Sequence, residues 1–137
     1  MADSYREGGC LCGAVRYRVP REPLQTVTCH CSHCQKQSGG AFSVVAVYPR
    51  GDLQLDGELS TFEDRGSSGQ TVFRQFCPRC GSPVITDTER AREQQLIFIK
   101  AGTLDDVQDL KPSLHCWCSS AQPWLQLGDD ATRLDRE

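Results

Sequence analysis

Seven of the nine cysteines in this chain lie in three short clusters whose spacing is typical of metal ligands. The clusters are Cys10-Leu-Cys12, Cys29-His-Cys31-Ser-His-Cys34 and Cys77-Pro-Arg-Cys80. Cysteines only one or two residues apart are poorly placed to form a disulfide with each other, but both can reach one ion. The odd total of nine also fits a disulfide framework poorly. We therefore expect the clusters to bind metal.

The number of thiols in each cluster separates a structural site from a chemical one. The first and third clusters together offer four thiolates, a complete tetrahedral set for structural zinc. The middle cluster offers three and leaves one position open, as catalytic zinc sites do. The sequence therefore predicts two zinc ions per chain: a structural zinc on Cys10, Cys12, Cys77 and Cys80, and a catalytic zinc on Cys29, Cys31 and Cys34.

The open position of the three-thiolate site favours a sulfur substrate. Thiolate ligands favour a soft donor beside them, and a thiol that binds a metal loses its proton. Cys29, Cys31 and Cys34 are therefore the expected catalytic residues, with the task of holding a thiol nucleophile. His30 and His33 are rival ligands: His30 points to the opposite face of a strand, whereas His33 could reach the metal or act as an acid or base. A surface or supporting position is the more ordinary expectation for both.

Spacing alone leaves a second pairing of the clusters open. Cys77 and Cys80 could join two cysteines of the middle cluster, and Cys10 and Cys12 could then join the second Cys-x-Cys pair, Cys116 and Cys118. We prefer to interpret the latter two as small hydrophobic residues on the inner face of a strand, a common role of cysteine.

Length and composition indicate a single small domain. A chain of 137 residues with 38% hydrophobic content has a modest core, which metal ions would supplement. The net charge of −3 argues against nucleic acid or a membrane surface as a partner. The longest apolar runs, 42–48 and 96–99, are too short to cross a bilayer, and the N-terminus lacks a signal-peptide pattern. We expect a cytoplasmic protein, in a reducing compartment where clustered cysteines bind metal.

The remaining pattern predicts a mainly β domain at 8–127, between a flexible start at 1–7 and a charged, solvated tail at 128–137. Short runs of β-branched and aromatic residues alternate with Gly, Pro and Asp. Helix is expected only at 32–37, with a turn at 103–106. The expected strands are 14–19, 42–48, 53–55, 59–62, 71–76, 83–86, 96–100 and 113–118, with a hairpin turn at Asp56-Gly57.

At its cysteine clusters the chain resembles the glutathione-dependent formaldehyde-activating family, which shares its domain with centromere protein V. The resemblance covers roughly residues 8–127 and rests on ordered motifs: Gly9-Cys-Leu-Cys-Gly13, Cys29-His-Cys-Ser-His-Cys34, Phe76-Cys-Pro-Arg-Cys-Gly-Ser82, Ala101-Gly-Thr-Leu-Asp105, Pro112-Ser-Leu-His115 and Pro123-Trp124. It implies an all-β, Mss4-like fold held by zinc, and the same division of the cysteines into structural and catalytic ligands. The cysteines at 116 and 118 depart from the family pattern.

The resemblance also implies a carbon–sulfur lyase that joins glutathione to formaldehyde, or cleaves the adduct. Glutathione carries two carboxylates, so the candidate anchors are Lys36, Arg65, Arg74, Lys100 and the loop 65–70, whereas Asp105 and Asp106 are candidate proton acceptors. A solvated surface position is the more ordinary expectation for each cation, and the loop is equally plausible as a flexible hairpin connection. The two aspartates lie where the start of a helix favours carboxylates. Two alternative functions are a non-catalytic, zinc-stabilised module that binds a protein, and a glutathione carrier or sensor without turnover.

Overall fold

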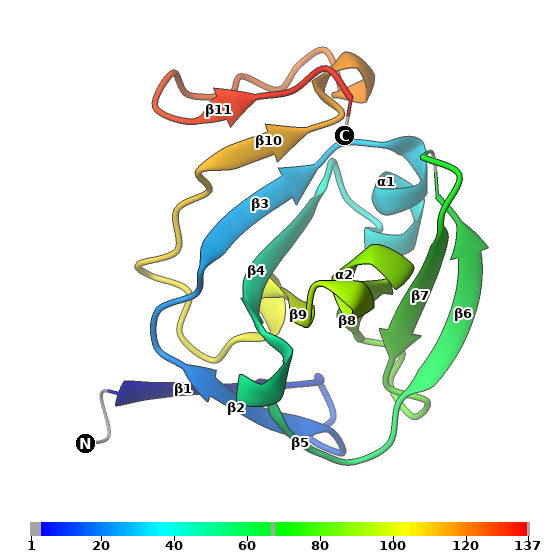
Figure 1. The fold of residues 1–137 in the computed structure, drawn as a ribbon, viewed down its shortest axis with the longest axis vertical. Helices are drawn as coiled ribbons and strands as arrows, with labels where there is room; N and C mark the ends of the chain where they lie inside the picture. Colours follow the sequence, from blue (N-terminus) through cyan, green and yellow to red (C-terminus); the bar gives the residue numbers. More distant parts are fainter. Residues whose placement is uncertain (1–3, 67, 137) are drawn as a thin grey trace.

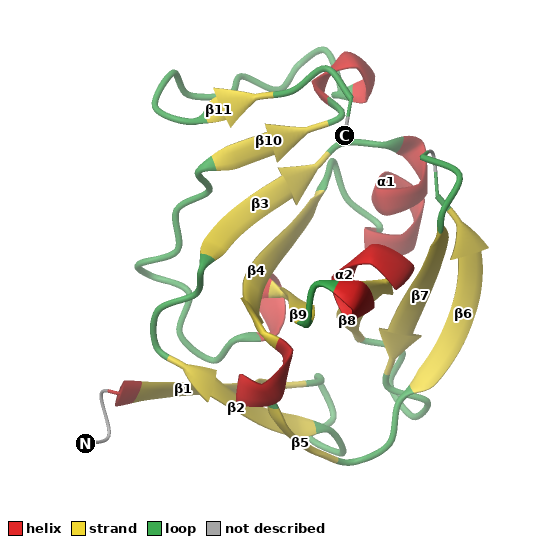
Figure 2. Cartoon of the chain, viewed as in Figure 1, coloured by secondary structure: helices red, strands yellow, loops and turns green. Residues whose placement is uncertain are grey.

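The computed structural model describes residues 4–66 and 68–136, which form a mainly β fold with two short α-helices and a few 3-10 turns (Figures 1 and 2). The mainly β prediction with little helix is confirmed. None of the helices in these residues is long and apolar enough to cross a membrane. The elements are β1 (Tyr5–Gly9), β2 (Arg16–Pro20), β3 (Gln25–Cys29), α1 (Ser32–Ser38), β4 (Ser43–Pro49), β5 (Gln54–Asp56), β6 (Ser60–Arg65), β7 (Thr71–Phe76), β8 (Pro83–Thr88), α2 (Glu89–Glu93), β9 (Leu96–Lys100), β10 (Leu114–Cys116) and β11 (Thr132–Arg133).

The strands form a small and a large sheet. The small sheet has the order β1-β2-β5 and lies across the base of the molecule in Figure 1. The large sheet has the order β11-β10-β3-β4-β9-β8-β7-β6, and its strands bend around α2. Helix α1 follows directly from β3, so the middle cysteine cluster lies at this strand-to-helix junction.

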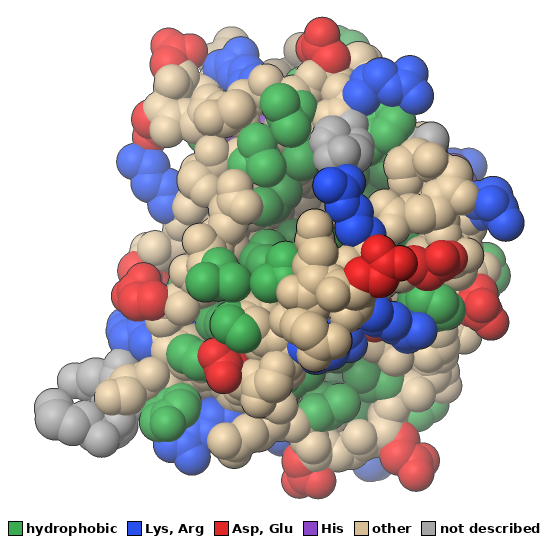
Figure 3. Space-filling model, in the orientation of Figure 1, with side chains coloured by type: hydrophobic (Ala, Val, Ile, Leu, Met, Phe, Trp, Pro, Cys, Tyr) green, Lys and Arg blue, Asp and Glu red, His purple; other side chains and the backbone are tan. Residues whose placement is uncertain are grey.

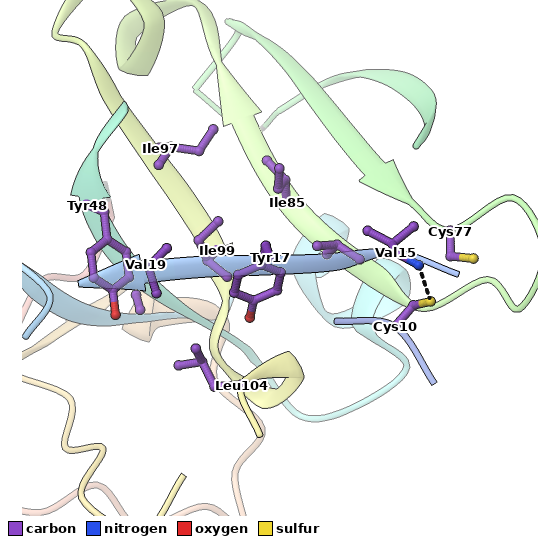
Figure 4. Close-up of a cluster of buried hydrophobic side chains, with 12 residues drawn as sticks. Cys10, Val15, Tyr17, Val19, Tyr48, Cys77, Ile85, Ile97, Ile99 and Leu104 are labelled. Carbon is purple, nitrogen blue, oxygen red and sulfur yellow. Dashed lines mark hydrogen bonds between the residues drawn. The ribbon is translucent and has the colours of Figure 1, made fainter. Parts of the chain in front are cut away.

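The hydrophobic core joins the two sheets. Its buried side chains come from β2 of the small sheet and from β4, β8 and β9 of the large sheet, and Figure 4 shows them in close contact. Alternate residues of β2 point inward, as the 2-residue period of a strand requires. Cys10 and Cys77 lie at one edge of this core, so the first and third cysteine clusters meet where the sheets join (Figure 4).

The predicted hairpin at Asp56-Gly57 is wrong. The turn exists, and Gly57 has a φ of 112°, but β5 pairs with β2 whereas β6 pairs with β7. A β-carbon on Gly57 would lie 2.5 Å from the carbonyl oxygen of Ala14, so close approach to the β2 hairpin requires glycine here. The turn therefore passes the chain from one sheet to the other.

Both chain ends contain strands that the sequence did not predict. Tyr5–Gly9 forms β1 and pairs along its whole length with β2, which contradicts a flexible start for residues 5–7. Thr132–Arg133 forms β11 and pairs in parallel with β10, so this part of the expected tail belongs to the large sheet. Strand β3 and helix α2 were also missed, although Thr88 caps α2 by accepting a hydrogen bond from the backbone N–H of Ala91.

An ion pair between a buried arginine and an exposed aspartate should make the free energy of unfolding depend on pH. Arg6 of β1 donates to both carboxylate oxygens of Asp109, at 3.1 and 2.8 Å, and these hydrogen bonds hold the pKa of Asp109 below its ordinary value. The contribution is therefore present above the unfolded pKa of about 3.9 and is lost as the pH falls through the lower folded pKa. We expect the free energy of unfolding to differ between the parent and Asp109→Asn near pH 7, and the difference to disappear in acid. Denaturant unfolding of the parent and the variant at each pH measures the two free energies of unfolding. A difference between them that does not change with pH would contradict the prediction.

Candidate metal centres

Two loops bring the first and third cysteine clusters together. Cys10 and Cys12 lie in the turn between β1 and β2, where Gly13 has a φ of 85°. Cys77 and Cys80 lie in the turn between β7 and β8, where Gly81 has a φ of 80°. These glycines adopt the left-handed conformation that lets each loop fold back around its sulfur atoms.

The four sulfur atoms of this group have the spacing that zinc requires. All lie within 4.8 Å of one another, with 3.6 Å between Cys10 and Cys12 and 3.8 Å between Cys12 and Cys77. Sulfurs at the corners of a tetrahedron with Zn–S bonds of about 2.3 Å are about 3.8 Å apart. Backbone N–H groups also stabilise thiolates here: Val15 donates to Cys10 at 3.2 Å and Arg79 donates to Cys77 at 3.3 Å. The donor set therefore fits a closed tetrahedral ion.

The middle cluster forms a second, smaller group at the start of α1. Cys29 is the last residue of β3, Cys31 is the N-cap of α1 and Cys34 lies in its first turn. Their sulfur atoms also lie within 4.8 Å of one another. Cys31 accepts a hydrogen bond from the backbone N–H of Cys34 at 3.3 Å, and thiol hydrogen bonds from Cys29 and Cys34 lower the pKa of Cys31 to about 2. The group therefore favours a single thiolate on Cys31, whereas the pKa values of the neighbouring thiols Cys29 and Cys34 are raised.

This three-cysteine group opens on a cavity of about 320 Å³ on the inner face of the large sheet. Pockets of about 300–1,000 Å³ are the usual size for small-molecule ligands. Val45 and Phe98 give the cavity an apolar wall, and Gly66, Ser68 and Gln70 line it from the loop between β6 and β7. Viewed as in Figure 1, hydrophobic side chains gather over β3 and β4 (Figure 3). The three sulfur atoms therefore face a space that can admit a small molecule.

Two buried cations lie near the three sulfur atoms. Arg74 of β7 lines the cavity, and its Nη1 lies 3.9 Å from the sulfur of Cys34. Lys100 of β9 donates to the hydroxyl of Ser43 at 2.6 Å, and burial lowers its pKa to about 8 although the Cys34 sulfur opposes the shift. Cations close to thiolates stabilise the charged form of sulfur.

In the part of the chain that the structure describes, neither histidine of the middle cluster belongs to a group of side chains that could bind a metal ion. His30 is fully buried and hydrogen-bonds the hydroxyl of Thr28 at 3.0 Å. His33 pairs with Asp64 at 2.9 Å in a neighbouring cleft, which Lys36 also lines. Both histidines therefore lie outside the group of three sulfur atoms.

The second Cys-x-Cys pair lies apart from the four-cysteine group. Cys116 is in β10, opposite Cys29 of β3, and lines the cavity beside the three-cysteine group. The thiol of Cys118 lies 3.5 Å from the carbonyl oxygen of His115. The structure thus groups Cys10 and Cys12 with the third cluster rather than with these two.

The candidate anchor Arg65 and the candidate proton acceptors Asp105 and Asp106 do not line the cavity. Arg65 donates to the carbonyl oxygen of Gly69 within its own loop, and Asp105 pairs with Arg16 at the surface. Asp106 caps a turn by accepting from the backbone N–H of Gln108. Sequence reasoning missed most of the other lining residues, because nothing in their local pattern distinguishes them; among these are Thr86, Thr88, Arg90, Phe98 and Trp117.

The sequence of the chain matches a known family. The sequence profile described as glutathione-dependent formaldehyde-activating enzyme matches residues 5–120. The chain belongs to this family. The match includes all seven clustered cysteines and every strand except β11.

Individual relatives agree with this assignment. Proteins from Halomonas elongata and Podospora anserina, both named "Putative glutathione-dependent formaldehyde-activating enzyme", are 27% and 25% identical to this chain. The alignments cover 88% and 97% of this chain, and 80% and 63% of those proteins. A crystal structure of a Rhodobacter sphaeroides protein has a TM-score of 0.55 at 24% identity, over 75% of this chain and 91% of that one. This structural likeness supports the fold alone.

Proposed function

We propose that this chain is a zinc-dependent, carbon–sulfur lyase-type enzyme that joins a thiol, glutathione, to a small aldehyde such as formaldehyde, or cleaves the product. Membership of the family supports the reaction class. The observation that carries the proposal is the unequal number of thiols in the two groups. Four sulfurs surround one position at the edge of the core, whereas three sulfurs face a cavity of about 320 Å³.

In this proposal each group has its own ion and its own task. Zinc, when bound to Cys29, Cys31 and Cys34, supplies a position where a thiol loses its proton and is held as a nucleophile. Cys10, Cys12, Cys77 and Cys80 would hold the structural ion.

The protein's residues would position the reactants and exclude water. The apolar wall of Val45 and Phe98 keeps the aldehyde in a poorly hydrated space beside the sulfur atoms. The forward reaction forms one carbon–sulfur bond, and the carbonyl electron pair moves to oxygen. The proton released by the thiol ends on that oxygen, so no oxidant or reductant is needed. The reverse reaction breaks the same carbon–sulfur bond.

A first test is the metal content of the purified chain together with its response to glutathione. We expect two equivalents of zinc per chain. After replacement of the ion on Cys29, Cys31 and Cys34 by cobalt(II), glutathione should increase the sulfur-to-cobalt charge-transfer absorption, because the fourth ligand becomes a thiolate. One ion per chain, or two ions whose spectra do not respond to thiols, would favour a non-catalytic, protein-binding module. Thiol binding without faster equilibration of glutathione and formaldehyde would identify a carrier or sensor.

We place this activity in the cytoplasm, where glutathione keeps cysteines reduced.

A further inference from the structure

We propose that Arg74 is a positioning residue of the three-cysteine centre, that is, of Cys29, Cys31 and Cys34 with their ion. Held in place by Asp64, Arg74 makes this centre favour an anionic sulfur ligand over a neutral ligand. The inference rests on the proposed function for the identity of the thiol, but it concerns ligand selection rather than turnover.

Arg74 occupies a position that a guanidinium group rarely adopts. It is only 3% exposed, and its side chain lies between the cavity and the neighbouring cleft, since it lines both. A buried guanidinium is stable only beside anionic or hydrogen-bonding partners. Its Nη1 lies 3.9 Å from the sulfur of Cys34, and its Nε donates to Asp64 at 2.9 Å. One end of the guanidinium therefore contacts a sulfur of the centre, and the other is tied to a carboxylate.

Asp64 fixes the direction of the guanidinium. It accepts hydrogen bonds from Arg74 and from His33, the latter at 2.9 Å, and its side chain is only 15% exposed. Because His33 precedes Cys34 on α1, whereas Asp64 and Arg74 lie on the adjacent strands β6 and β7, these four residues join the helix to the sheet. The guanidinium therefore cannot turn from the sulfur without breaking its ion pair.

The charge of the centre explains what such a cation would do. A divalent ion with three thiolates carries a formal charge of −1, and a fourth thiolate makes it −2, whereas a neutral ligand leaves it unchanged. A fixed positive charge in a buried setting favours the more negative state. Arg74 should therefore lower the free energy of the thiolate complex more than that of a complex with a neutral ligand. Lys100 lies on another strand and adds a second positive charge.

The test compares a charged and a neutral ligand on the cobalt-substituted protein. Arg74→Met removes the charge and keeps most of the side-chain volume, and Arg74→Lys restores a charge without the guanidinium fork. We expect Arg74→Met to weaken glutathione binding by about tenfold to a hundredfold, the effect of losing a hydrogen bond to a charged group. Imidazole, a neutral ligand, should bind as it does to the parent, and Arg74→Lys should recover part of the glutathione affinity.

A matched control removes a buried arginine far from the centre. Arg6 is 6% exposed and pairs with the exposed Asp109, so Arg6→Met also removes a buried guanidinium from an ion pair but should leave both ligand affinities unchanged. Equal weakening of glutathione and imidazole by Arg74→Met would show a purely structural role and overturn the proposal. Unchanged glutathione affinity in Arg74→Met would also overturn the proposal. Failure of the parent protein to bind any thiol would overturn it as well. A parent that binds glutathione selectively through Arg74 but shows no turnover would refute the enzymatic function and leave this inference intact.

Discussion

Replacing Cys77 by serine is expected to release one of two metal ions and to leave the chain largely unfolded. Cys77 is fully buried in the core, and its sulfur lies 3.8 Å from that of Cys12 and accepts N–H groups of Arg79 and Cys80. A structural zinc contributes about 10 kcal/mol or more to folding, which is comparable to the total stability of a domain, about 5–15 kcal/mol. Loss of one thiolate from a closed site should therefore remove most of the stability. Metal analysis and circular dichroism of the purified variant measure both effects.

Cys118→Ser is the matched control for this substitution. Cys118 is a partly buried cysteine outside both sulfur groups. Its replacement should retain two ions and change the free energy of unfolding by about 1 kcal/mol or less. If Cys77→Ser keeps both ions and a native spectrum, the four-sulfur group is not a metal site.

The sequence was most informative where the chemistry is local. Each cysteine cluster spans at most six residues, so its spacing alone indicates that its sulfurs can converge. The turns that make this convergence possible are also local, since Gly13 and Gly81 follow their clusters directly and adopt positive φ. The start of α1 was predicted for the same reason, as the chain turns within the middle cluster.

The rest depends on contacts between distant segments, which a local pattern does not contain. Asp56-Gly57 has the composition of a hairpin turn, yet its flanking strands pair in different sheets because β5 completes the small sheet beside β2. From charge alone, Arg74 was as good a candidate anchor for a substrate carboxylate as Lys36, Arg65 and Lys100. Only the pairing of β6 with β7 places Asp64 beside Arg74 and makes it the cation next to Cys34.

Replacing Cys34 by serine is expected to abolish thiol binding and turnover while the fold persists. Cys34 is buried on α1 and belongs to the group that faces the cavity rather than to the group in the core. Its loss removes one of three thiolates from an open site, which should lose its ion, whereas the four-sulfur group remains complete. Metal-ion catalysis contributes several kcal/mol to transition-state stabilisation, so the catalysed rate should fall by about a thousandfold or more. Exchange spectroscopy of glutathione and formaldehyde at equilibrium measures the rate above the uncatalysed background.

Cys116→Ser separates the role of the three-cysteine group from that of any cysteine in the cavity. Cys116 lines the same cavity and lies opposite Cys29 in the sheet, but it is outside the sulfur group. We expect this variant to keep two ions and turnover within about threefold of the parent, because the group that binds the thiol is intact. Cys34→Ser should keep one ion and a native circular dichroism spectrum, with no response to glutathione. Parent-like glutathione affinity in Cys34→Ser, or an equal loss of activity in Cys116→Ser, would show that the thiol does not bind at the open position of this centre.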